Sequence, residues 1–479
     1  MSNLETLEPL ISLAKRRGFI YQSSEIYGGL NSCWDYGPRG VELKRNVKEQ
    51  WWHDNVTTRE DVVGLDASIL MHSRVWEASG HVAGFHDPLI DNRESKARYR
   101  ADHLIEQHVK NLRDNGENGE ADRVQSELEE AGNNPEALYR IIVDEEVKDP
   151  VSGSTDWTKV RQFNLMFKTH FGPTEDSGNE VFLRPETAQG IFVNFDNVVS
   201  TMRVKVPFGI AQIGKAFRNE VTTGNFIFRS REFEQMELEY FVRPENTEES
   251  FDEWVQSRFD WYVSLGITED KLRLRSHGDE ELAHYARSCD DVEYKFPFGW
   301  SELEGIADRG TYDLDRHIEY SGKKLDYFDQ PNNERFVPAV VESSAGVDRT
   351  VLTLLADAYW EDEENDRTVL RLAPKIAPMK AAVFPLFNKQ GMPEMARSIY
   401  EDLHTHFATF YDSGGSIGKR YRRQDEAGTP YCITVDHDSV EDGTVTIRDR
   451  DSLEQIRVHA DNLVDVLTEK LQAAEVSLE

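Results

Sequence analysis

Two kinds of hydrophobic pattern divide the first half of the chain. Residues 4–17 and 41–52 carry apolar positions at the three- and four-residue spacing of amphipathic helices, with glycine-containing turns predicted at 28–30 and 35–40. Residues 160–244 are instead dense in apolar and aromatic side chains, with runs typical of β-strands. The pattern therefore predicts a mixed helix-and-sheet protein.

The segment 216–242 carries the clearest strand signal. Two strand-like runs flank a polar turn at 222–225, which predicts an antiparallel hairpin. Alternation places one mostly apolar set on the face that suits a core: Glu234, Met236, Leu238 and Tyr240. The opposite face carries Arg231, Phe233, Gln235, Glu237 and Glu239. An average strand would turn such a polar face to solvent, but Arg218 and Glu220 on the first run converge on it and favour a binding surface.

A second segment predicts an anion site. Residues 337–342 resemble a buried strand, 343–346 a Ser/Gly turn, and the apolar positions from Val347 onward follow helical spacing. Arg349 therefore lies in the first turn of a helix, where backbone donors and a guanidinium attract phosphate. Taken alone the signal is weak, because many helices begin with glycine and an early arginine.

Composition along the chain predicts its domains. Residues 89–160 are rich in charge and turn signals and include a polar helix at 121–131, which indicates an inserted module. A second insertion is predicted at about 245–300. Strands and helices alternate after a proline-bracketed linker at 374–378. We expect a first domain at 1–375 and a small α/β domain at 376–479.

The chain is strongly acidic, with a net charge of −33 from 88 acidic and 55 basic residues. Nucleic-acid-binding proteins are ordinarily neutral or basic, so this charge argues against an RNA partner. Two interpretations are open. One is a well-solvated acidic surface with local basic patches; the other is adaptation to high salt, which the scarcity of lysine also fits.

Other compositional features exclude several classes of protein. No apolar stretch approaches the length of a membrane span or of an export signal. Cys33, Cys289 and Cys432 are far apart and form no CxxC pair, which argues against a disulfide framework or a thiolate zinc site. These features predict a cytoplasmic protein.

Together the hairpin and the helix start resemble the class II aminoacyl-tRNA synthetases. The second signature motif of that family matches residues 217–220 and 231–233, and the third matches Gly346 to Arg349. The first, a dimer-forming helix and strand, falls within 34–67. Further matches resemble the glycyl-tRNA synthetases: residues 34–38, 184–190, 284–286, 302–307, 342–346 and 415–425.

The resemblance implies a fold and an activity. The fold is α/β (α+β): a catalytic domain on an antiparallel sheet flanked by helices, an inserted helical/mixed module and a C-terminal α/β anticodon-binding domain. The activity is glycine–tRNA ligation, in which ATP activates glycine to glycyl-adenylate and the glycyl group passes to tRNA(Gly). The implied partners are ATP, Mg²⁺, glycine, tRNA(Gly) and a second copy of the chain in a homodimer.

The resemblance also assigns roles to residues. Arg218, Arg349 and Glu302 are the catalytic set, and Glu302 also binds the Mg²⁺ that accompanies ATP. The ATP set is Arg218, Asn219, Glu220, Phe228, Arg229, Ser230, Arg231, Glu232, Phe233, Glu302, Leu303, Gly346, Val347, Asp348 and Arg349. The glycine set is Arg100, Glu186, Phe233, Glu234, Gln235, Met236, Glu237, Glu342, Ser343, Ser344, Ala345 and Gly346. The tRNA set is the basic cluster Lys419, Arg420, Tyr421, Arg422 and Arg423, whose charge and ring also suit single-stranded RNA.

The chemistry agrees with these assignments. Carboxylate attack on the α-phosphate needs no protein nucleophile, only positioning and compensation of negative charge. Glycine has no side chain to grip, so selection rests on steric exclusion, and we expect no editing domain. Some relatives carry cysteines just before Arg100; residues 91–98 have none, so no structural zinc is expected.

Two alternative functions compete with this one. Some synthetase-like proteins are non-catalytic, nucleic-acid-binding accessory subunits, but these typically lose the ATP arginines that Arg218, Arg231 and Arg349 would supply here. A related synthetase for serine, threonine, proline or histidine is the other alternative, and the acidic, small-residue glycine set argues against it.

Overall fold

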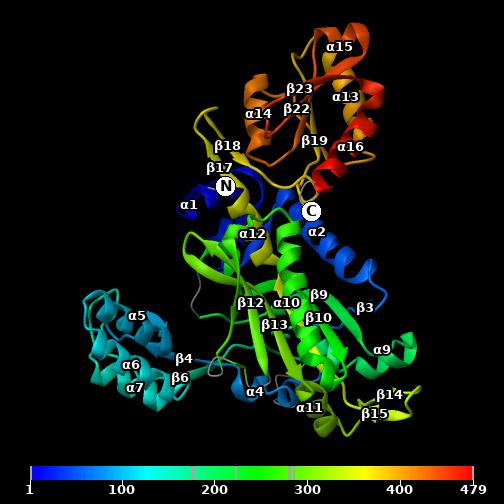
Figure 1. Ribbon diagram of the computed structural model, residues 1–479. Coiled ribbons are helices and arrows are strands. Elements are labelled where there is room, and N and C mark those ends of the chain that lie inside the picture. Colours follow the sequence, from blue (N-terminus) through cyan, green and yellow to red (C-terminus); the bar gives the residue numbers. More distant parts are fainter. Residues whose placement is uncertain (1–2, 174–178, 222–223, 279–281, 284–285, 477–479) are drawn as a thin grey trace.

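A seven-stranded sheet forms the centre of the computed structural model, which describes residues 3–173, 179–221, 224–278, 282–283 and 286–476 (Figure 1). Its order is β11 (Leu272–Ser276), β12 (Ser288–Phe296), β13 (Gly299–Gly310), β16 (Ala339–Gly346), β10 (Glu232–Val242), β9 (Phe208–Phe217) and β3 (Val62–Gly64). All neighbours are antiparallel except β3 and β9. The class II type of sheet expected from the sequence is confirmed.

Side-chain alternation on β10 divides the two faces of the sheet as predicted. Met236 and Leu238 enter the main hydrophobic core, while Glu237 and Glu239 point to the other face. The polar face is nevertheless not solvated, because both glutamates are at most 1% exposed. Buried carboxylates are costly unless they are paired or protonated, so this face is built for a purpose other than packing.

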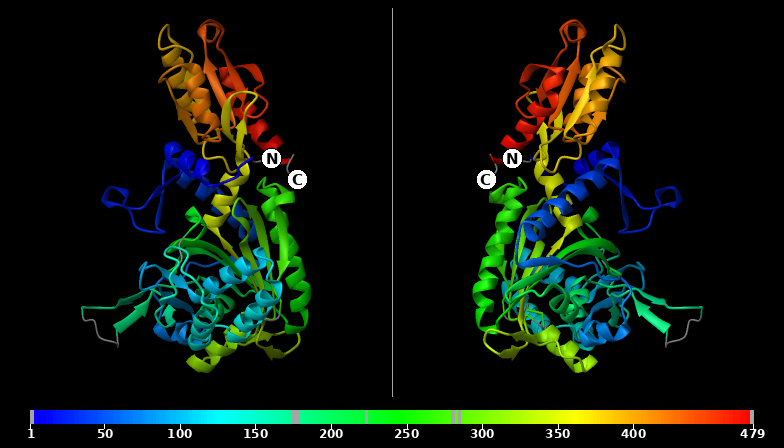
Figure 2. Two further views of the ribbon diagram at one scale, coloured as in Figure 1. Left: turned by 90° about the vertical axis from the view of Figure 1, so that its left-hand side faces the viewer. Right: turned by 90° about the vertical axis from the view of Figure 1, so that its right-hand side faces the viewer.

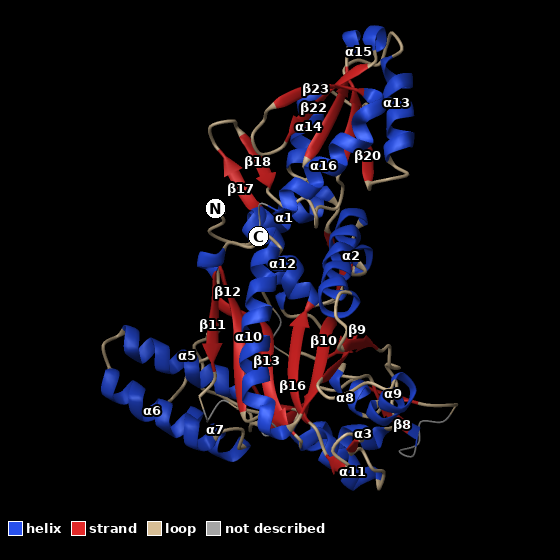
Figure 3. Cartoon of the chain, turned by 45° about the vertical axis from the view of Figure 1, so that its right-hand side comes forward, coloured by secondary structure: helices blue, strands red, loops and turns tan. Residues whose placement is uncertain are grey.

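Three long helices cover the apolar face of the sheet: α2 (Pro38–Trp52), α10 (Thr247–Ser264) and α12 (Val347–Ala358) (Figure 3). Residues 245–300, expected as a second insertion, include α10, β11 and β12. Trp254 and Tyr262 of α10 share one core with Leu238 of β10, so this segment belongs to the main layer structure and forms no separate module.

The charge-rich segment does form a module with a core of its own. A three-stranded sheet of β4 (His86–Asp91), β5 (Arg98–Arg100) and β6 (Arg161–Asn164) carries α5 (Ala101–Asp114), α6 (Asn118–Ala131) and α7 (Pro135–Asp144). Fourteen buried residues from Ile90 to Val160 make up this core. The module lies to one side of the main sheet (Figure 1).

Short elements surround the main sheet. The N-terminal part holds α1 (Glu8–Arg17), β1 (Ile20–Gln22), β2 (Trp34–Tyr36), α3 (Ser73–Ala78) and α4 (His81–Gly84). The middle holds β7 (Lys168–His170), β8 (Glu180–Phe182), α8 (Ala188–Phe192), α9 (Phe195–Met202), α11 (Tyr312–Ser321), β14 (Tyr327–Asp329) and β15 (Glu334–Phe336). The β7–β8 pair projects from the body of the molecule (Figure 2).

The C-terminal α/β domain lies at one end of the molecule (Figures 1 and 2). Its sheet has the order β20 (Thr409–Tyr411), β19 (Ala381–Pro385), β21 (Tyr431–Val435), β22 (Thr444–Asp449) and β23 (Gln455–His459). Its helices are α13 (Met392–Leu403), α14 (Ile417–Asp425), α15 (His437–Asp442) and α16 (Leu463–Val476). The hairpin β17 (Tyr359–Asp362) and β18 (Arg367–Leu370) reaches it, and Arg367 pairs with Asp425 at 3.2 Å.

Two predicted turns take other forms in the structure, and a third, at 222–225, lies partly outside the described residues. Residues 343–346 continue β16 straight into α12, because Ser343 and Ala345 pair with β10 as ladder residues. The segment 35–40 is the end of β2 followed by α2, which Pro38 begins. The β9–β10 connection contains a 3₁₀ turn at Phe226–Phe228, and Thr222 and Thr223 lie outside the described residues.

Two further observations concern the described part of the chain. No helix there has the length and apolar character needed to cross a bilayer. Cys33, Cys289 and Cys432 are all free thiols.

Candidate active site

A cleft of about 310 Å³ opens on the polar face of the main sheet. Its floor is formed by β10, β13 and β16, and its wall by the ends of β9, β11 and β12 and by the loop before β10. The predicted ATP residues that line it are Arg218, Glu220, Phe228, Arg229, Ser230, Phe233, Glu302, Leu303, Gly346, Asp348 and Arg349. The predicted glycine residues that line it are Glu186, Phe233, Glu234, Gln235, Glu237, Glu342, Ser344 and Gly346.

Arg218 presents a nearly uncommitted guanidinium to the cleft. It follows β9 directly, and its backbone N–H donates to the Arg231 carbonyl across the hairpin at 2.9 Å. The side chain donates one hydrogen bond, from Nε to the Pro185 carbonyl at 3.1 Å, and lies 5.4 Å from the centre of the Phe233 ring. Within the described residues it has no carboxylate partner inside 4 Å. Its positive charge is therefore available to a ligand anion.

Arg349 and Glu302 form the opposite side of the same opening. Arg349 comes from the first turn of α12, lies 4.5 Å from the Phe228 ring centre and pairs with the Glu302 carboxylate at 3.2 Å. The charge of Arg349, with that of Arg218, lowers the pKa of Glu302, so this carboxyl is ionised at neutral pH. The arrangement sets one carboxylate between two cations at a site open to solvent.

Glu302 faces the cleft because of an irregularity in β13. Glu293 of β12 pairs with Glu302, but the preceding Val292 pairs with Glu304, so Leu303 is an extra residue. Glu302 and Glu304 consequently point to opposite faces, and Glu304 is buried against Arg258 at 2.7 Å. Beyond this bulge, Gly305 and Ala307 present only small groups to the cleft.

A group of carboxylates occupies the deep end of the cleft. Burial by itself raises the pKa of Glu186, but the charge and hydrogen bond of His81 at 3.2 Å, helped by Arg309 and Gln189, hold that pKa well below its usual range. Burial and the charges of Glu342 and Glu186 instead raise the pKa of Glu237, which accepts a hydrogen bond from Thr187. The site thus sets an ionised carboxylate, Glu186, beside a carboxyl, Glu237, whose pKa is raised to about 8.

Glu239 and Glu342 continue this group below the cleft. Burial, then the charge of Glu342, raises the pKa of Glu239 well above its usual range, and neither Glu239 oxygen has a hydrogen-bond partner among the described residues. Glu342 pairs with Arg309, which also makes two hydrogen bonds to Asp313, at 2.7 and 2.8 Å. Arg309 therefore supplies the counter-charge for an acidic layer that would otherwise repel itself.

Amide and hydroxyl groups complete the floor. Gln235 donates from Nε2 to Ser344 Oγ at 3.1 Å, a pair that β10 and β16 bring together. The Gln235 Oε1 atom is buried with no partner among the described residues, which leaves it available to a donor on a ligand.

Several predicted residues lie outside the cleft: Arg100, Asn219, Arg231, Glu232, Met236, Ser343, Ala345 and Val347. Met236 and Ala345 are core residues on the other face, because neighbours in a strand point to opposite sides, and Val347 enters the same core as the first residue of α12. Glu234 reaches the cleft only in part, since its carboxylate pairs with Lys44 at 2.7 Å and Lys48 at 3.0 Å.

Arg100 lies at the base of the inserted module, paired with Asp87 at 3.0 Å and Asp102 at 2.5 Å. Burial lowers the pKa of Arg100, but the hydrogen bond and charge of Asp102 raise it more. The charges of Asp87 and of Glu220, a cleft residue, raise it further. Arg100 is thus a neighbour of the cleft rather than part of its lining.

Other residues of the cleft escaped sequence reasoning. Thr187 and His81 contact the deep glutamates, and Arg309 balances them. His277 and Asp291 line the wall with a 2.7 Å hydrogen bond between them. Thr187 adjoins Glu186 in a recognised motif, but the others come from distant segments. His284 and Tyr285, part of a recognised motif, lie outside the described residues.

The basic cluster on α14 is largely used inside its own domain. Arg420 is 2% exposed and donates to four backbone carbonyls, including those of Leu386 and Gly415. The Tyr421 hydroxyl bonds to Thr434 at 2.6 Å, and its ring packs against Phe384. Of the five residues, only Lys419 is classed as exposed.

Comparison with known proteins agrees with this geometry. Residues 167–358 match the family model "tRNA synthetase class II core domain (G, H, P, S and T)", residues 87–124 and 117–165 match "Glycyl-tRNA synthetase insertion domain 1", and residues 380–470 match "Anticodon binding domain". The chain is 54% identical over 471 residues to a "Glycine--tRNA ligase" of Chlorobaculum tepidum, covering 97% of this chain and 100% of that protein.

The chain belongs to the glycyl-tRNA synthetase family. Two other similar relatives named "Glycine--tRNA ligase" come from Geobacillus kaustophilus, at 54% identity over 97% of this chain and 99% of that protein, and from Staphylococcus haemolyticus, at 53% over 98% and 99%. The family resemblance expected from the sequence is therefore confirmed over nearly the whole chain. The segment 87–165 thus matches the insertion domain of this family, and the C-terminal domain matches an anticodon-binding domain.

Proposed function

We propose that this chain activates glycine with ATP to glycyl-adenylate and transfers the glycyl group to tRNA(Gly). One observation carries the proposal. A single cleft holds two guanidinium groups at its open side, the nearly uncommitted Arg218 and the Glu302-paired Arg349, and two buried carboxyls, Glu186 and Glu237, at its deep end. Phosphate binds at the first place and an ammonium group at the second.

ATP occupies the open side. Arg218 contacts the α-phosphate, where the glycine carboxylate attacks and negative charge gathers in the transition state. Arg349 holds the distant phosphates and covers one side of the adenine, whose other side stacks on Phe233. Glu220 reads the adenine edge. The position of Arg218 beside the Phe233 ring supports this pose, because it sets a phosphate contact next to a stacking surface.

The residues present fit a Mg²⁺ ion bound with ATP. Glu302 offers an ionised, solvent-accessible carboxylate, and Mg²⁺ prefers one or two such oxygens together with phosphate oxygens. When bound, Mg²⁺ compensates charge on the phosphates. Glu302 holds the ion and Arg349, its ion-pair partner, orients the carboxylate.

Glycine occupies the deep end. Glu186 and Glu237 accept hydrogen bonds from its ammonium group, and the unpartnered Gln235 Oε1 and the Ser344 hydroxyl offer further polar contacts. The surrounding side chains are fixed by ion pairs such as Arg309 to Glu342, so the site cannot widen for a larger amino acid without breaking them. Steric exclusion of any side chain beyond hydrogen therefore supplies the selectivity.

ATP–pyrophosphate exchange with single amino acids tests this function. We expect exchange with glycine and none above background with alanine, serine, threonine, proline or histidine. Exchange with one of the others would assign a different synthetase. No exchange with any amino acid, in a protein that is folded by circular dichroism, would favour the non-catalytic accessory subunit.

The anticodon-binding domain is the proposed contact for tRNA(Gly). Lys419 is its exposed cation on α14, whereas Arg420 and Tyr421 act from within the fold. Arg422 and Arg423 are half-buried, and each bonds to backbone carbonyls. Charging assays with full-length tRNA and with an anticodon-stem variant would show whether this domain selects the substrate.

A homodimer is the proposed assembly. The loop between β1 and β2 exposes three large apolar side chains: Ile26 at 89%, Tyr27 at 87% and Leu30 at 55%. Adjacent exposed apolar groups of this size mark interfaces in soluble proteins. Light scattering should give the mass of two chains, and replacing Ile26 and Tyr27 with glutamate should shift it toward one.

A further inference from the structure

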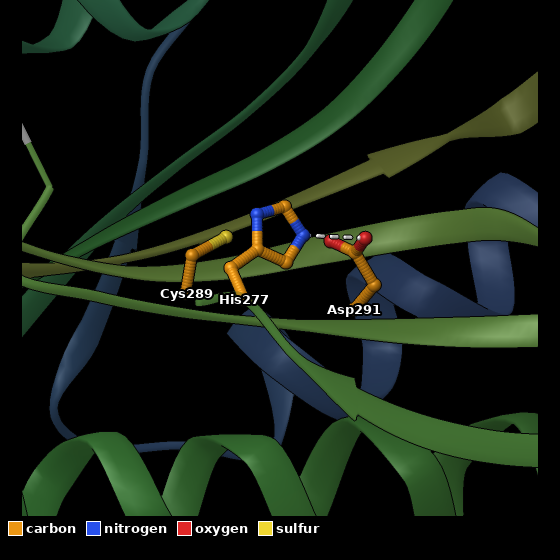
Figure 4. A group of neighbouring side chains, drawn as sticks. All are labelled: His277, Cys289 and Asp291. Carbon is orange, nitrogen blue, oxygen red and sulfur yellow. Dashed lines mark hydrogen bonds and ion pairs between the residues drawn. The ribbon is translucent and has the colours of Figure 1, made fainter. Parts of the chain in front are cut away.

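Three potential metal ligands in the wall of the cleft have no part in the proposed reaction. His277 follows β11, and Cys289 and Asp291 lie two residues apart on β12, so strand alternation turns both toward the same side. The His277 backbone N–H donates to the Cys289 carbonyl at 2.9 Å, which extends the β11–β12 ladder and fixes the two segments together. Figure 4 shows the three side chains converging from these two segments.

The geometry is compact enough for one ion. A ring nitrogen of His277, the thiol sulfur of Cys289 and a carboxylate oxygen of Asp291 all lie within 4.8 Å of one another. All three side chains line the cleft, so a fourth ligand from solvent or nucleotide can reach the same point. From these contacts we propose that His277, Cys289 and Asp291 bind one divalent cation of the zinc class.

The donor set decides the class of cation. One sulfur, one nitrogen and one oxygen donor suit Zn²⁺, which takes all three types in tetrahedral sites and keeps one position open where only three protein ligands are present. Mg²⁺ prefers oxygen donors only, so it fits Glu302 and not this group. The second cluster of buried acids, Glu237, Glu239 and Glu342, has only oxygen donors and belongs to the proposed glycine site.

The charges around Cys289 also favour a cation. Four carboxyl groups, those of Asp290, Asp291, Glu302 and Glu342, contribute negative charge near its thiol. Arg275 is the nearby cation, 3.8 Å from the Asp291 carboxylate. Binding replaces the His277–Asp291 hydrogen bond with bonds to the metal, and the thiol proton passes to solvent.

Cobalt(II) titration of the metal-stripped full chain, without nucleotide, tests the proposal. Co²⁺ takes the same tetrahedral positions as Zn²⁺ and absorbs light through a thiolate-to-metal charge transfer. We expect a saturable band at one equivalent per chain, lost on addition of Zn²⁺. The Cys289→Ser protein should lack the band, and Asp291→Asn should weaken binding at least about tenfold.

Two control variants keep the result specific. Cys33→Ser removes a partly exposed thiol that belongs to no such group within the described residues, and Asp290→Asn removes the carboxylate next to Asp291 in sequence. Both should retain the band, and circular dichroism should show that every variant is folded. The proposal would be overturned if the wild-type chain gave no saturable band. It would also be overturned if the band survived the Cys289→Ser substitution or disappeared in Cys33→Ser. Pyrophosphate exchange is a separate measurement, so failure of the metal site leaves the proposed function untouched.

Discussion

Two arginine-rich places in this molecule use the same side chain for opposite purposes. In the cleft, Arg218 gives one hydrogen bond to a carbonyl and has no carboxylate within 4 Å in the described structure. On α14, Arg420 is buried and gives its hydrogen bonds to the carbonyls of Pro385, Leu386, Asp412 and Gly415. The first guanidinium is kept available; the second holds a loop and a strand end together.

The difference shows what makes an arginine a binding residue. A guanidinium has five N–H donors, and each donor that a carbonyl takes is lost to a ligand. Arg218 follows a strand at the edge of an open cleft, so few backbone acceptors reach it. Arg420 is buried, and the carbonyls of Pro385 at the end of β19 and of Asp412 and Gly415 before α14 accept its hydrogen bonds. Four experiments follow, from the largest expected effect to the smallest, and the first two test this comparison directly.

Arg218→Ala should nearly abolish glycine-dependent pyrophosphate exchange while leaving the fold intact. Loss of a charge-assisted contact made in the transition state costs about 3–4 kcal/mol, which is about 10²–10³-fold in rate. Initial exchange rates and circular dichroism measure the two effects. A variant with half the wild-type rate would remove Arg218 from its role.

Arg420→Met should act on stability instead of catalysis. The change leaves several buried carbonyls without a donor, and each such group costs about 1–3 kcal/mol. Urea unfolding should show a less stable anticodon-binding domain, while pyrophosphate exchange stays near wild type. Lys419→Ala, one residue earlier and exposed, is the matched control and should change stability by less than about 0.5 kcal/mol. Unchanged stability together with lost tRNA charging would instead make Arg420 an RNA contact.

The glycine KM should fall as pH rises through about 8. The pKa of Glu237 is raised to about 8 by burial and by Glu342 and Glu186, so below that pH the group is protonated and cannot attract an ammonium ion. The carboxylate fraction increases with pH, and between about pH 7 and 8.5 it should lower KM roughly five- to tenfold. Glu237→Gln should remove this dependence in the same window. A wild-type KM that rises over this range would contradict the assignment of Glu237 to glycine.

Charging should increase modestly with salt, by about twofold, before it declines. The net charge of −33 per chain repels tRNA at low ionic strength, and screening weakens that long-range field more than it weakens close contacts. Ordinary counterion release acts in the opposite direction. Aminoacylation rates across a KCl series separate the two interpretations of the acidic surface. A rate maximum below about 0.1 M KCl, where the Debye length is about 10 Å, would favour an acidic surface without adaptation to salt.

Local sequence determined much of the architecture and part of the site. The period-two alternation in 232–242 placed Met236 and Leu238 in the core and Glu237 on the functional face. The spacing after Gly346 placed Arg349 in the first turn of α12. Both predictions depend on backbone geometry that repeats over a few residues, so they need no knowledge of the rest of the fold. The family motifs then supplied the predicted reaction, which backbone periodicity alone does not indicate.

Only the tertiary structure decided which groups are paired. The bulge at Leu303 shifts the side-chain alternation of β13 by one residue. Glu302 and Glu304 therefore point to opposite faces of the sheet although they are two residues apart. Arg309 and Arg420 have the same local appearance as ligand-binding arginines, yet Arg309 pairs with Glu342 of β16 and Arg420 bonds to the Pro385 carbonyl of β19, both distant in sequence. Strand alternation is a local property that can be read from the sequence. The charge, burial and free donors of a side chain depend on segments that meet only after folding. Many residues of this site could therefore be predicted from the sequence, but their pairing and burial could be found only in the folded structure.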